Sequence, residues 1–396
     1  MRSVYLDNAA ATPILPEVVE AMMPFLKDAY GNPQSLHRWG DKPREAIEDA
    51  RSKVAALIGA APEEIIFTSS GSEANNLAIK GLAMGQQAKG KHILVSAVEH
   101  FSVLNSARTM EKMGFELSLV PVDMFGMVDP DEVARHIRDN TILVSIMHAN
   151  SEVGTIQPIR EIAERVKKAG AVFHTDAVAT AGTVPIDTKS TGIDSLSLAG
   201  SPFYGPKGIG ALWVRKGVRI IPLIDGGVQE GGRRAGTEDV PAIVGLGKAA
   251  ELAAKEMEPR TKQLSLLRDR LAKGLLSRVE QMILTGHLTQ RLPGNASFCV
   301  EFIEGESMIM LLNHHGIAAS SGSACTSKAL KASHVLLAMG IPHEIAAGSV
   351  LLSLGLGSTE ADVDYVIDTL PAVVDRLRQM SPLYAKFIKE QAERRQ

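Results

Sequence analysis

Short apolar segments alternate with longer amphipathic segments between about residues 45 and 215. The apolar segments are rich in Val and Ile and lack strict apolar–polar alternation, which is typical of strands covered on both faces. The stretches between them have apolar residues at helical spacing, as in Pro158–Lys168, which ends at Ala169-Gly170. Strands that alternate with helices predict a mostly parallel sheet with helices on both sides. The expected strands are Ile65–Thr68, His92–Ser96, Glu116–Pro121, Ile142–Met147, Ala171–Thr175, Ser195–Leu198 and Ile209–Val214.

The pattern changes after Glu258. A long helical stretch, Arg260–Gln281, comes before shorter strand candidates at Ala296–Phe302 and Ile317–Ser320. We therefore expect a large α/β domain over residues 16–258. We expect a smaller α+β domain from residues 1–15 and 259–396.

Composition narrows the function classes. The formal net charge of −3 argues against a generally basic nucleic-acid binder, and we expect neither a nucleic-acid nor a membrane partner. Two cysteines, Cys299 and Cys325, are too few for a disulfide-stapled scaffold or for an iron–sulfur site built only from cysteines of one chain. A reducing cytoplasm is the expected location.

The first candidate site is the turn Thr68-Ser69-Ser70-Gly71-Ser72-Glu73, which follows a strand and leads into a helix. Backbone N–H groups at a helix start suit a phosphate. An ordinary N-cap by Ser70 or Ser72 accounts for the same residues equally well.

Three further candidates follow predicted strands. Asp176 lies at a strand end, where a carboxylate points into the usual ligand crevice and could pair with a protonated ring nitrogen; a loop cap is as good an interpretation. His100 could stack on a flat ligand or move protons. Taken alone, His100 and Asn150 fit partly buried polar residues with backbone partners better.

Two loops complete the set. Gly226–Thr237 holds five glycines together with Arg233 and Arg234, and could bring backbone and guanidinium groups close to an anion. Cys325 lies among small polar residues in Ser320–Ser327, a setting that favours a reactive thiol over packing. Cys299, within an apolar stretch, fits the core.

Taken together, these segments resemble the cysteine desulfurases of the NifS/IscS type, in the class V aminotransferase family of pyridoxal 5'-phosphate (PLP) enzymes. The resemblance covers nearly the whole chain. It implies the PLP-dependent transferase fold (type I, aspartate aminotransferase-like): a mostly parallel sheet in a large domain, plus a smaller α+β domain. The segments that carry it are Tyr5–Pro13, Gly31-Asn32-Pro33, Tyr204–Gly208, Arg233–Thr237, Ser320–Ser327 and Met380–Tyr384.

The resemblance also implies roles. In that family a lysine holds PLP as a Schiff base, and a loop cysteine removes sulfur from substrate cysteine as a persulfide, leaving alanine. Here Cys325 would accept the sulfur, His100 would stack on the cofactor, and Asn150 would contact cofactor or substrate. The phosphate would be bound by Gly71, Ser72 and, across a homodimer interface, Thr237, while Asp176 would face the pyridine nitrogen.

This sequence departs from the family pattern at several positions of the site. Pro202 stands where the Schiff-base lysine belongs and Ser201 where a histidine precedes it. Leu356 replaces the arginine that binds the substrate carboxylate, and Ala179 a glutamine near the cofactor. Ser70 replaces a glycine of the phosphate turn, a milder change. Without the lysine, PLP should bind weakly or not at all.

These departures favour a desulfurase-like protein of iron–sulfur cluster assembly that cannot itself desulfurate cysteine. It would dock on an IscU-type scaffold protein through the region after Pro382. Cys325 would accept sulfur or supply one ligand to a shared [2Fe-2S] cluster. The alternatives are an active desulfurase that releases L-alanine, a non-catalytic oligomerisation partner, and a different enzyme on this fold, for which no residue pattern argues.

Overall fold

The core of the molecule is a seven-stranded sheet with strand order β2-β8-β7-β6-β5-β3-β4. The computed structural model describes residues 2–321 and 332–394. Strands β3 to β7 run parallel, and β8 is antiparallel to both of its neighbours. The predicted mostly parallel sheet is therefore confirmed. The strands are β2 (Ile65–Thr68), β3 (His92–Ser96), β4 (Glu116–Val120), β5 (Thr141–Ser145), β6 (Val172–Asp176), β7 (Ser195–Ala199) and β8 (Gly210–Val214).

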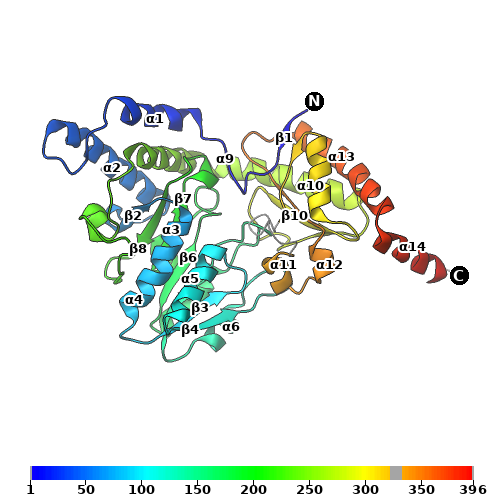
Figure 1. Cartoon of the computed structure of the whole chain (residues 1–396), viewed down its shortest axis with the longest axis horizontal. Coiled ribbons are helices and arrows are strands. Elements are labelled where there is room, and N and C mark those ends of the chain that lie inside the picture. Colours follow the sequence, from blue (N-terminus) through cyan, green and yellow to red (C-terminus); the bar gives the residue numbers. More distant parts are fainter. Residues whose placement is uncertain (1, 322–331, 395–396) are drawn as a thin grey trace.

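Helices cover both faces of this sheet (Figure 1). Successive residues of β2 show the division, because Ile65 and Phe67 pack into one core and Ile66 packs into the other. One face is covered by α2 (Arg38–Leu57), α6 (Pro130–His136), α7 (Ile159–Lys168) and the first part of α9 (Val240–Arg278). The other face is covered by α3 (Gly71–Asn76), the π-helix η2 (Leu77–Gly81), α4 (Leu82–Gln86) and α5 (Phe101–Lys112).

A second core lies on the other side of the molecule (Figure 1). It is built on a three-stranded antiparallel sheet of order β12-β10-β9 and a short parallel pair of β1 with β11. The strands are β1 (Val4–Tyr5), β9 (Met282–Leu284), β10 (Asn295–Val300), β11 (Ile317–Ala318) and β12 (Ser349–Ser353). Its helices are α10 (Gly305–His314) and α13 (Glu360–Gln379), together with part of a long helix described below. The helices α11 (His334–Ala338) and α12 (His343–Ala346) pack in a separate small cluster, and α14 (Pro382–Arg394) follows α13 with no buried residue.

Helix α9 links the two cores. It spans 39 residues, far more than the predicted stretch from Arg260 to Gln281. Its first part, up to Ala253, packs on the large sheet, and its second part, from Leu264, packs in the small core. The changeover comes at Pro259, close to the expected boundary after residue 258, and the division into two domains stays a prediction. The remaining helical segments are α1 (Pro16–Lys27), η1 (Pro62–Glu64), α8 (Thr188–Thr191), η3 (Ser201–Phe203) and η4 (Gln229–Gly232).

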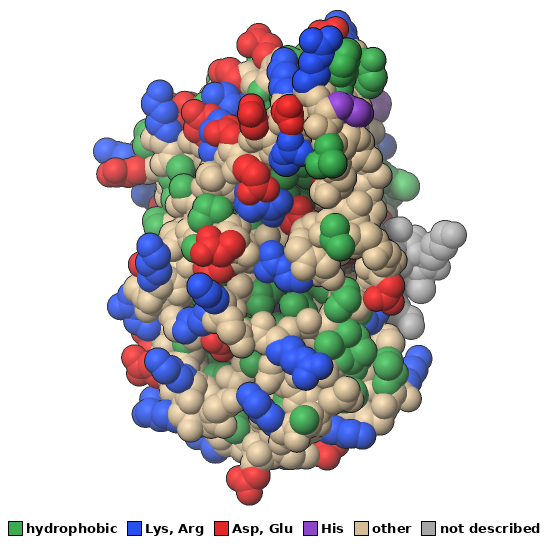
Figure 2. Space-filling view, turned by 90° about the vertical axis from the view of Figure 1, so that its left-hand side faces the viewer, with side chains coloured by type: hydrophobic (Ala, Val, Ile, Leu, Met, Phe, Trp, Pro, Cys, Tyr) green, Lys and Arg blue, Asp and Glu red, His purple; other side chains and the backbone are tan. Residues whose placement is uncertain are grey.

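Charges of both signs are mixed on one face of the molecule (Figure 2). Figure 2 shows Lys and Arg interspersed with Asp and Glu, with small apolar areas between them, on the face at the left of Figure 1. Across residues 2–321 and 332–394, no helix combines the length and the apolar character needed to cross a membrane.

Candidate active site

A cavity of about 590 Å³ lies where the two cores meet. Its walls come from the carboxyl ends of β6 and β7, the start of α3, the N-terminal segment, α9 and the segment after β12. This is the edge of a parallel sheet where ligands of α/β proteins usually bind. The lining includes Asn8, Thr12, Gly71, Ser72, Asn75, His100, Asp176, Ala179, Pro202, Tyr204, Arg260, Asn295, Leu354 and Leu356.

Asp176 ends β6 at the wall of this cavity, only 5% exposed. Its Oδ2 accepts a hydrogen bond from Asn75 Nδ2 at 2.6 Å, and its Oδ1 accepts one from the Val178 N–H at 2.9 Å. Burial raises the pKa of this carboxyl. Because the two bonds come from neutral donors, a cationic ligand group beside Asp176 would stabilise its charged form.

The phosphate-type turn opens α3. Ser70 is its N-cap, and the Ser70 hydroxyl accepts a hydrogen bond from the Glu73 N–H at 3.1 Å. Gly71 and Ser72, in the first turn, line the cavity, and their N–H groups have no acceptor within the helix. Position 71 has no room for a larger residue, because a Cβ there would lie 2.6 Å from Val178 Cγ2. The cap is therefore present, and the anion-binding groups remain open beside it.

His100 lines the cavity as the N-cap of α5, and its Nδ1 accepts a hydrogen bond from the Ser102 N–H at 3.1 Å. Asn150 is placed differently. Its Oδ1 accepts bonds from the N–H groups of Glu152 and Val153, and its Nδ2 donates to the Val98 carbonyl. Asn150 thus stabilises a turn beside the site, and its contact with a ligand stays a prediction.

Pro202 and Leu356 both line the cavity. Pro202 lies in η3, and the Leu356 N–H donates to the Tyr204 hydroxyl at 2.7 Å. Lys207, the nearest lysine in sequence to Pro202, is not among the lining residues, and its Nζ donates to the Thr12 carbonyl oxygen at 2.9 Å. In the part of the chain that the structure describes, no lysine lines this cavity.

The glycine-rich loop is held by one ion pair to α3 and by hydrogen bonds to backbone carbonyls. Arg234 pairs with Glu73 of α3, with its Nε 2.9 Å from Oε1. Arg233 donates to the backbone carbonyls of Glu230 and Glu63. Both guanidinium groups thus anchor the loop, where the sequence suggested that they bring charge to an anion. Thr237, at the end of the loop, is exposed and does not line the cavity of its own chain.

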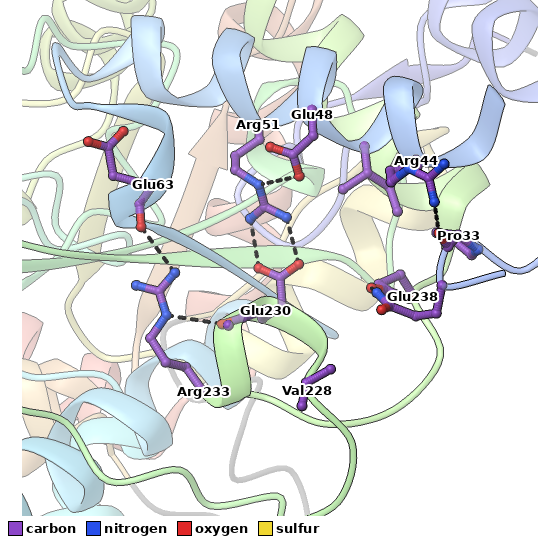
Figure 3. A pocket seen from close by; sticks show the side chains of 12 residues that line it. Pro33, Arg44, Glu48, Arg51, Glu63, Val228, Glu230, Arg233 and Glu238 are labelled. Carbon is purple, nitrogen blue, oxygen red and sulfur yellow. Dashed lines mark hydrogen bonds and ion pairs between the residues drawn. The ribbon is translucent and has the colours of Figure 1, made fainter. Parts of the chain in front are cut away.

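A buried ion pair holds the middle of this loop (Figure 3). Arg51 of α2 donates two hydrogen bonds to Glu230, at 2.7 Å and 2.8 Å, and Glu230 also accepts the Phe67 N–H of β2 at 2.9 Å. Glu230 is 8% exposed and has a left-handed backbone with φ of +49°. A smaller cavity of about 310 Å³ lies over this pair. Sequence reasoning missed the pair because its members are 179 residues apart.

Cys325, expected to be the reactive thiol and a possible metal ligand, lies outside the described residues. Cys299 is fully buried in β10, and burial raises the pKa of its thiol to about 12. The core interpretation of Cys299 is therefore supported. Within residues 2–321 and 332–394, no group of three or more His, Cys, Asp or Glu side chains could hold a metal ion.

A second buried acid, Glu99, lies behind the site. Its Oε1 accepts hydrogen bonds from the Ser96 hydroxyl at 2.6 Å and the Met147 N–H at 2.7 Å, while its buried Oε2 has no partner among the described residues. Burial, and to a smaller extent the nearby charge of Asp176, raises the pKa of Glu99 to about 8. The sequence places Glu99 directly before His100, but only the packing shows its burial.

Comparison with known proteins supports one family. Residues 4–366 match the model of the class-V aminotransferases. The chain is 54% identical to "Cysteine desulfurase IscS" of Methanosarcina thermophila, over 97% of this chain and 95% of that protein. It is 50% identical to "Cysteine desulfurase IscS 1" of Archaeoglobus fulgidus, over 96% of this chain and 100% of that protein.

Solved structures agree with the sequence relatives. A "NIFS-LIKE PROTEIN" superposes with a TM-score of 0.89 at 37% identity, covering 95% of this chain and 100% of the other. "SspA in complex with cysteine" superposes with a TM-score of 0.80 at 35% identity, covering 89% and 99%. The fold is thus that of the PLP-dependent aminotransferase-like proteins. Within this class, the chain belongs to the cysteine desulfurase IscS family.

The buried Arg51–Glu230 pair gives a stability prediction. In Glu230→Gln the guanidinium loses its counter-charge, and in either amide orientation the Gln nitrogen faces an N–H donor of Arg51. We expect the free energy of unfolding to fall by about 3–5 kcal/mol, measured by urea denaturation. The exposed pair Arg270–Asp364 serves as control, and Asp364→Asn should change stability by less than about 1 kcal/mol. Equal effects of the two variants would contradict this role of Glu230.

Glu99 gives a prediction on pH dependence. Its pKa is raised from 4.5 to about 8 in the folded protein, so between these values the folded chain keeps a proton that the unfolded chain releases. Its contribution to stability is therefore present at low pH and is lost as pH rises toward 8, by up to about 1.4 kcal/mol per pH unit. Glu99→Gln removes this titration.

The measurement is the difference in unfolding free energy between wild type and Glu99→Gln from pH 5 to pH 9. This difference cancels the titration of other groups. It should change in favour of the variant up to about pH 8 and then level off. A difference that is constant with pH would show that Glu99 ionises normally.

Proposed function

We propose that this chain acts in iron–sulfur cluster assembly as a partner of an IscU-type scaffold protein and does not itself desulfurate cysteine. The observation that carries the proposal is the presence of Pro202 and Leu356 in the lining of the same cavity as Asp176 and His100. By the family pattern, these two positions supply the amine that holds the cofactor and the guanidinium that holds the substrate. Proline has no side-chain amine, and leucine offers no charge to a carboxylate.

PLP is the cofactor that the family implies, and the cavity fits two of its three chemical ends. The N–H groups of Gly71 and Ser72 would hold the phosphate, and the buried Asp176 carboxylate would accept a bond from the ring nitrogen. When bound, PLP supplies an electron sink for reactions at the α-carbon of an amino acid. No lysine among the described lining residues could link it to the chain, so we propose reversible binding.

Cys325 is proposed as the group that carries sulfur. Its thiolate would attack the outer sulfur of a persulfide on a donor protein; the S–S bond of the donor breaks, the donor leaves as a thiolate, and Cys325 becomes the persulfide. Alternatively, the Cys325 thiolate would supply one ligand of a [2Fe-2S] cluster that the scaffold holds mainly by its own cysteines. The low cysteine count supports a reducing cytoplasm as the setting.

The proposal includes a homodimer. Thr237 is exposed and does not line the cavity of its own chain. The Arg234–Glu73 ion pair holds its loop beside α3. Large apolar side chains are also exposed on the segments next to this loop, with Leu36 at 99% and Tyr30 at 74%. Such exposure favours a covered interface in solution. Thr237 would then reach the phosphate end of the partner's cavity.

The first test addresses PLP and catalysis. Full-length protein with added PLP should lose the cofactor on gel filtration, retain no label after borohydride reduction, and release no alanine from L-cysteine. Light scattering on the same sample should give the mass of a dimer. The double variant Pro202→Lys/Leu356→Arg restores the amine and the guanidinium, and should gain a borohydride-fixed label. Alanine release by the unmodified protein would overturn the proposal in favour of an active desulfurase.

The second test addresses Cys325. Cys325→Ser should abolish persulfide labelling of the chain and reduce cluster formation on the scaffold by at least about tenfold, because serine forms no persulfide and is a poor iron ligand. The matched control is Cys299→Ala, which removes the buried thiol and should leave transfer unchanged. Unchanged cluster assembly with Cys325→Ser would contradict the proposed role of Cys325.

A further inference from the structure

Arg260 is the one Lys or Arg among the described residues that line the main cavity. It lies on α9 just after Pro259, where the helix passes from the large core to the small core. We propose that Arg260 binds the carboxylate of a small ligand in this cavity. The inference rests on the proposed function in one respect, namely that Leu356 leaves the cavity without its family arginine.

The guanidinium is held in place but keeps spare donors. Its side chain is 13% exposed, and its Nε and Nη2 both donate to one oxygen of Glu256, at 3.0 Å and 2.6 Å. An arginine has five N–H donors in a planar fork, and Nη1 has no acceptor among the described residues. Glu256 is 45% exposed, so water weakens this pair and competes for the carboxylate.

Arg260 and Leu356 line the same cavity and both contact Tyr204. The guanidinium carbon lies 6.0 Å from the centre of the Tyr204 ring, and the Tyr204 hydroxyl accepts the Leu356 N–H at 2.7 Å. One tyrosine thus contacts both positions. Leu264 and Leu354 also line the cavity and reduce the local polarity, which strengthens a pair between a guanidinium and a carboxylate.

The other side-chain amides of the lining already have acceptors. Asn8 Nδ2 donates to the Ser353 carbonyl at 2.8 Å, Asn295 Nδ2 donates to the Ser151 carbonyl at 2.9 Å, and Asn75 Nδ2 donates to Asp176. Arg260 is therefore the charged donor that is available to an anionic ligand at this end. The fitting ligand class is a small carboxylic acid whose remainder is apolar or a thiol.

The test uses the full-length chain without added cofactor and two probes, 3-mercaptopropionate and 3-mercapto-1-propanol. The first carries a carboxylate where the second carries a hydroxyl group. Neither has an amine that could react with PLP. Dissociation constants are measured by ligand-observed NMR at fixed ionic strength. Arg260→Gln should weaken 3-mercaptopropionate binding by about 10- to 100-fold and leave the alcohol within about twofold, because one charge-assisted pair is lost.

Three matched variants make the outcome specific. Glu256→Gln frees the guanidinium and should tighten 3-mercaptopropionate binding a few-fold. Arg270→Gln removes an arginine of the same helix that pairs with the exposed Asp364, and should change nothing. Leu356→Arg, added to Arg260→Gln, should restore carboxylate binding, which a variant that only damaged the fold could not do.

The proposal is overturned if 3-mercaptopropionate does not bind the wild type, if Arg260→Gln leaves its binding unchanged, or if both probes weaken equally. A PLP titration separates this inference from the proposed function. If PLP fails to bind while Arg260-dependent carboxylate binding is present, the cofactor proposal fails and the Arg260 proposal stands. If PLP binds reversibly and the Arg260→Gln change does not affect carboxylate binding, the Arg260 proposal fails and the cofactor proposal stands.

Discussion

The packing of one helix into two hydrophobic cores determines the site. Helix α9 buries Leu246 against the large sheet and Leu271 in the small core, so the two cores cannot separate without exposing apolar surface. The cavity lies where the helix changes cores, and Arg260 is at this changeover. The distance between the sheet edge and the segment after β12 is therefore fixed by hydrophobic packing.

Electrostatic contacts then arrange the polar groups around the cavity. The buried Arg51–Glu230 pair and the Arg234–Glu73 pair tie the glycine-rich loop to α2, β2 and α3. Glu73 also stabilises the turn before α3, because its carboxylate accepts a hydrogen bond from the Ser69 N–H at 2.7 Å. The loop and the phosphate-type turn are thus one connected unit, and a change in either alters the other.

The cavity has groups that suit a phosphorylated cofactor, but Pro202 and Leu356 in its lining offer no amine or guanidinium. Its sheet side keeps a buried carboxylate, a helix start with open N–H groups and a histidine, which suit a flat, phosphorylated ligand. The same lining includes Pro202, just after β7, and Leu356, after β12, and Arg260 lies nearby on α9 beside Tyr204. This combination is the physical basis of our proposal that the chain binds the cofactor without carrying out the desulfuration.

The sequence by itself determined the elements of the sheet and the family, because buried parallel strands leave continuous Val- and Ile-rich segments and the site motifs are local. It also pointed to Asp176, Gly71, Ser72 and His100, which lie at or shortly after strand ends and line one cavity. Only the tertiary structure decided which groups are paired. Glu230 with Arg51, Arg234 with Glu73, and Arg260 beside Tyr204 join residues distant in the chain, and no local pattern records such contacts.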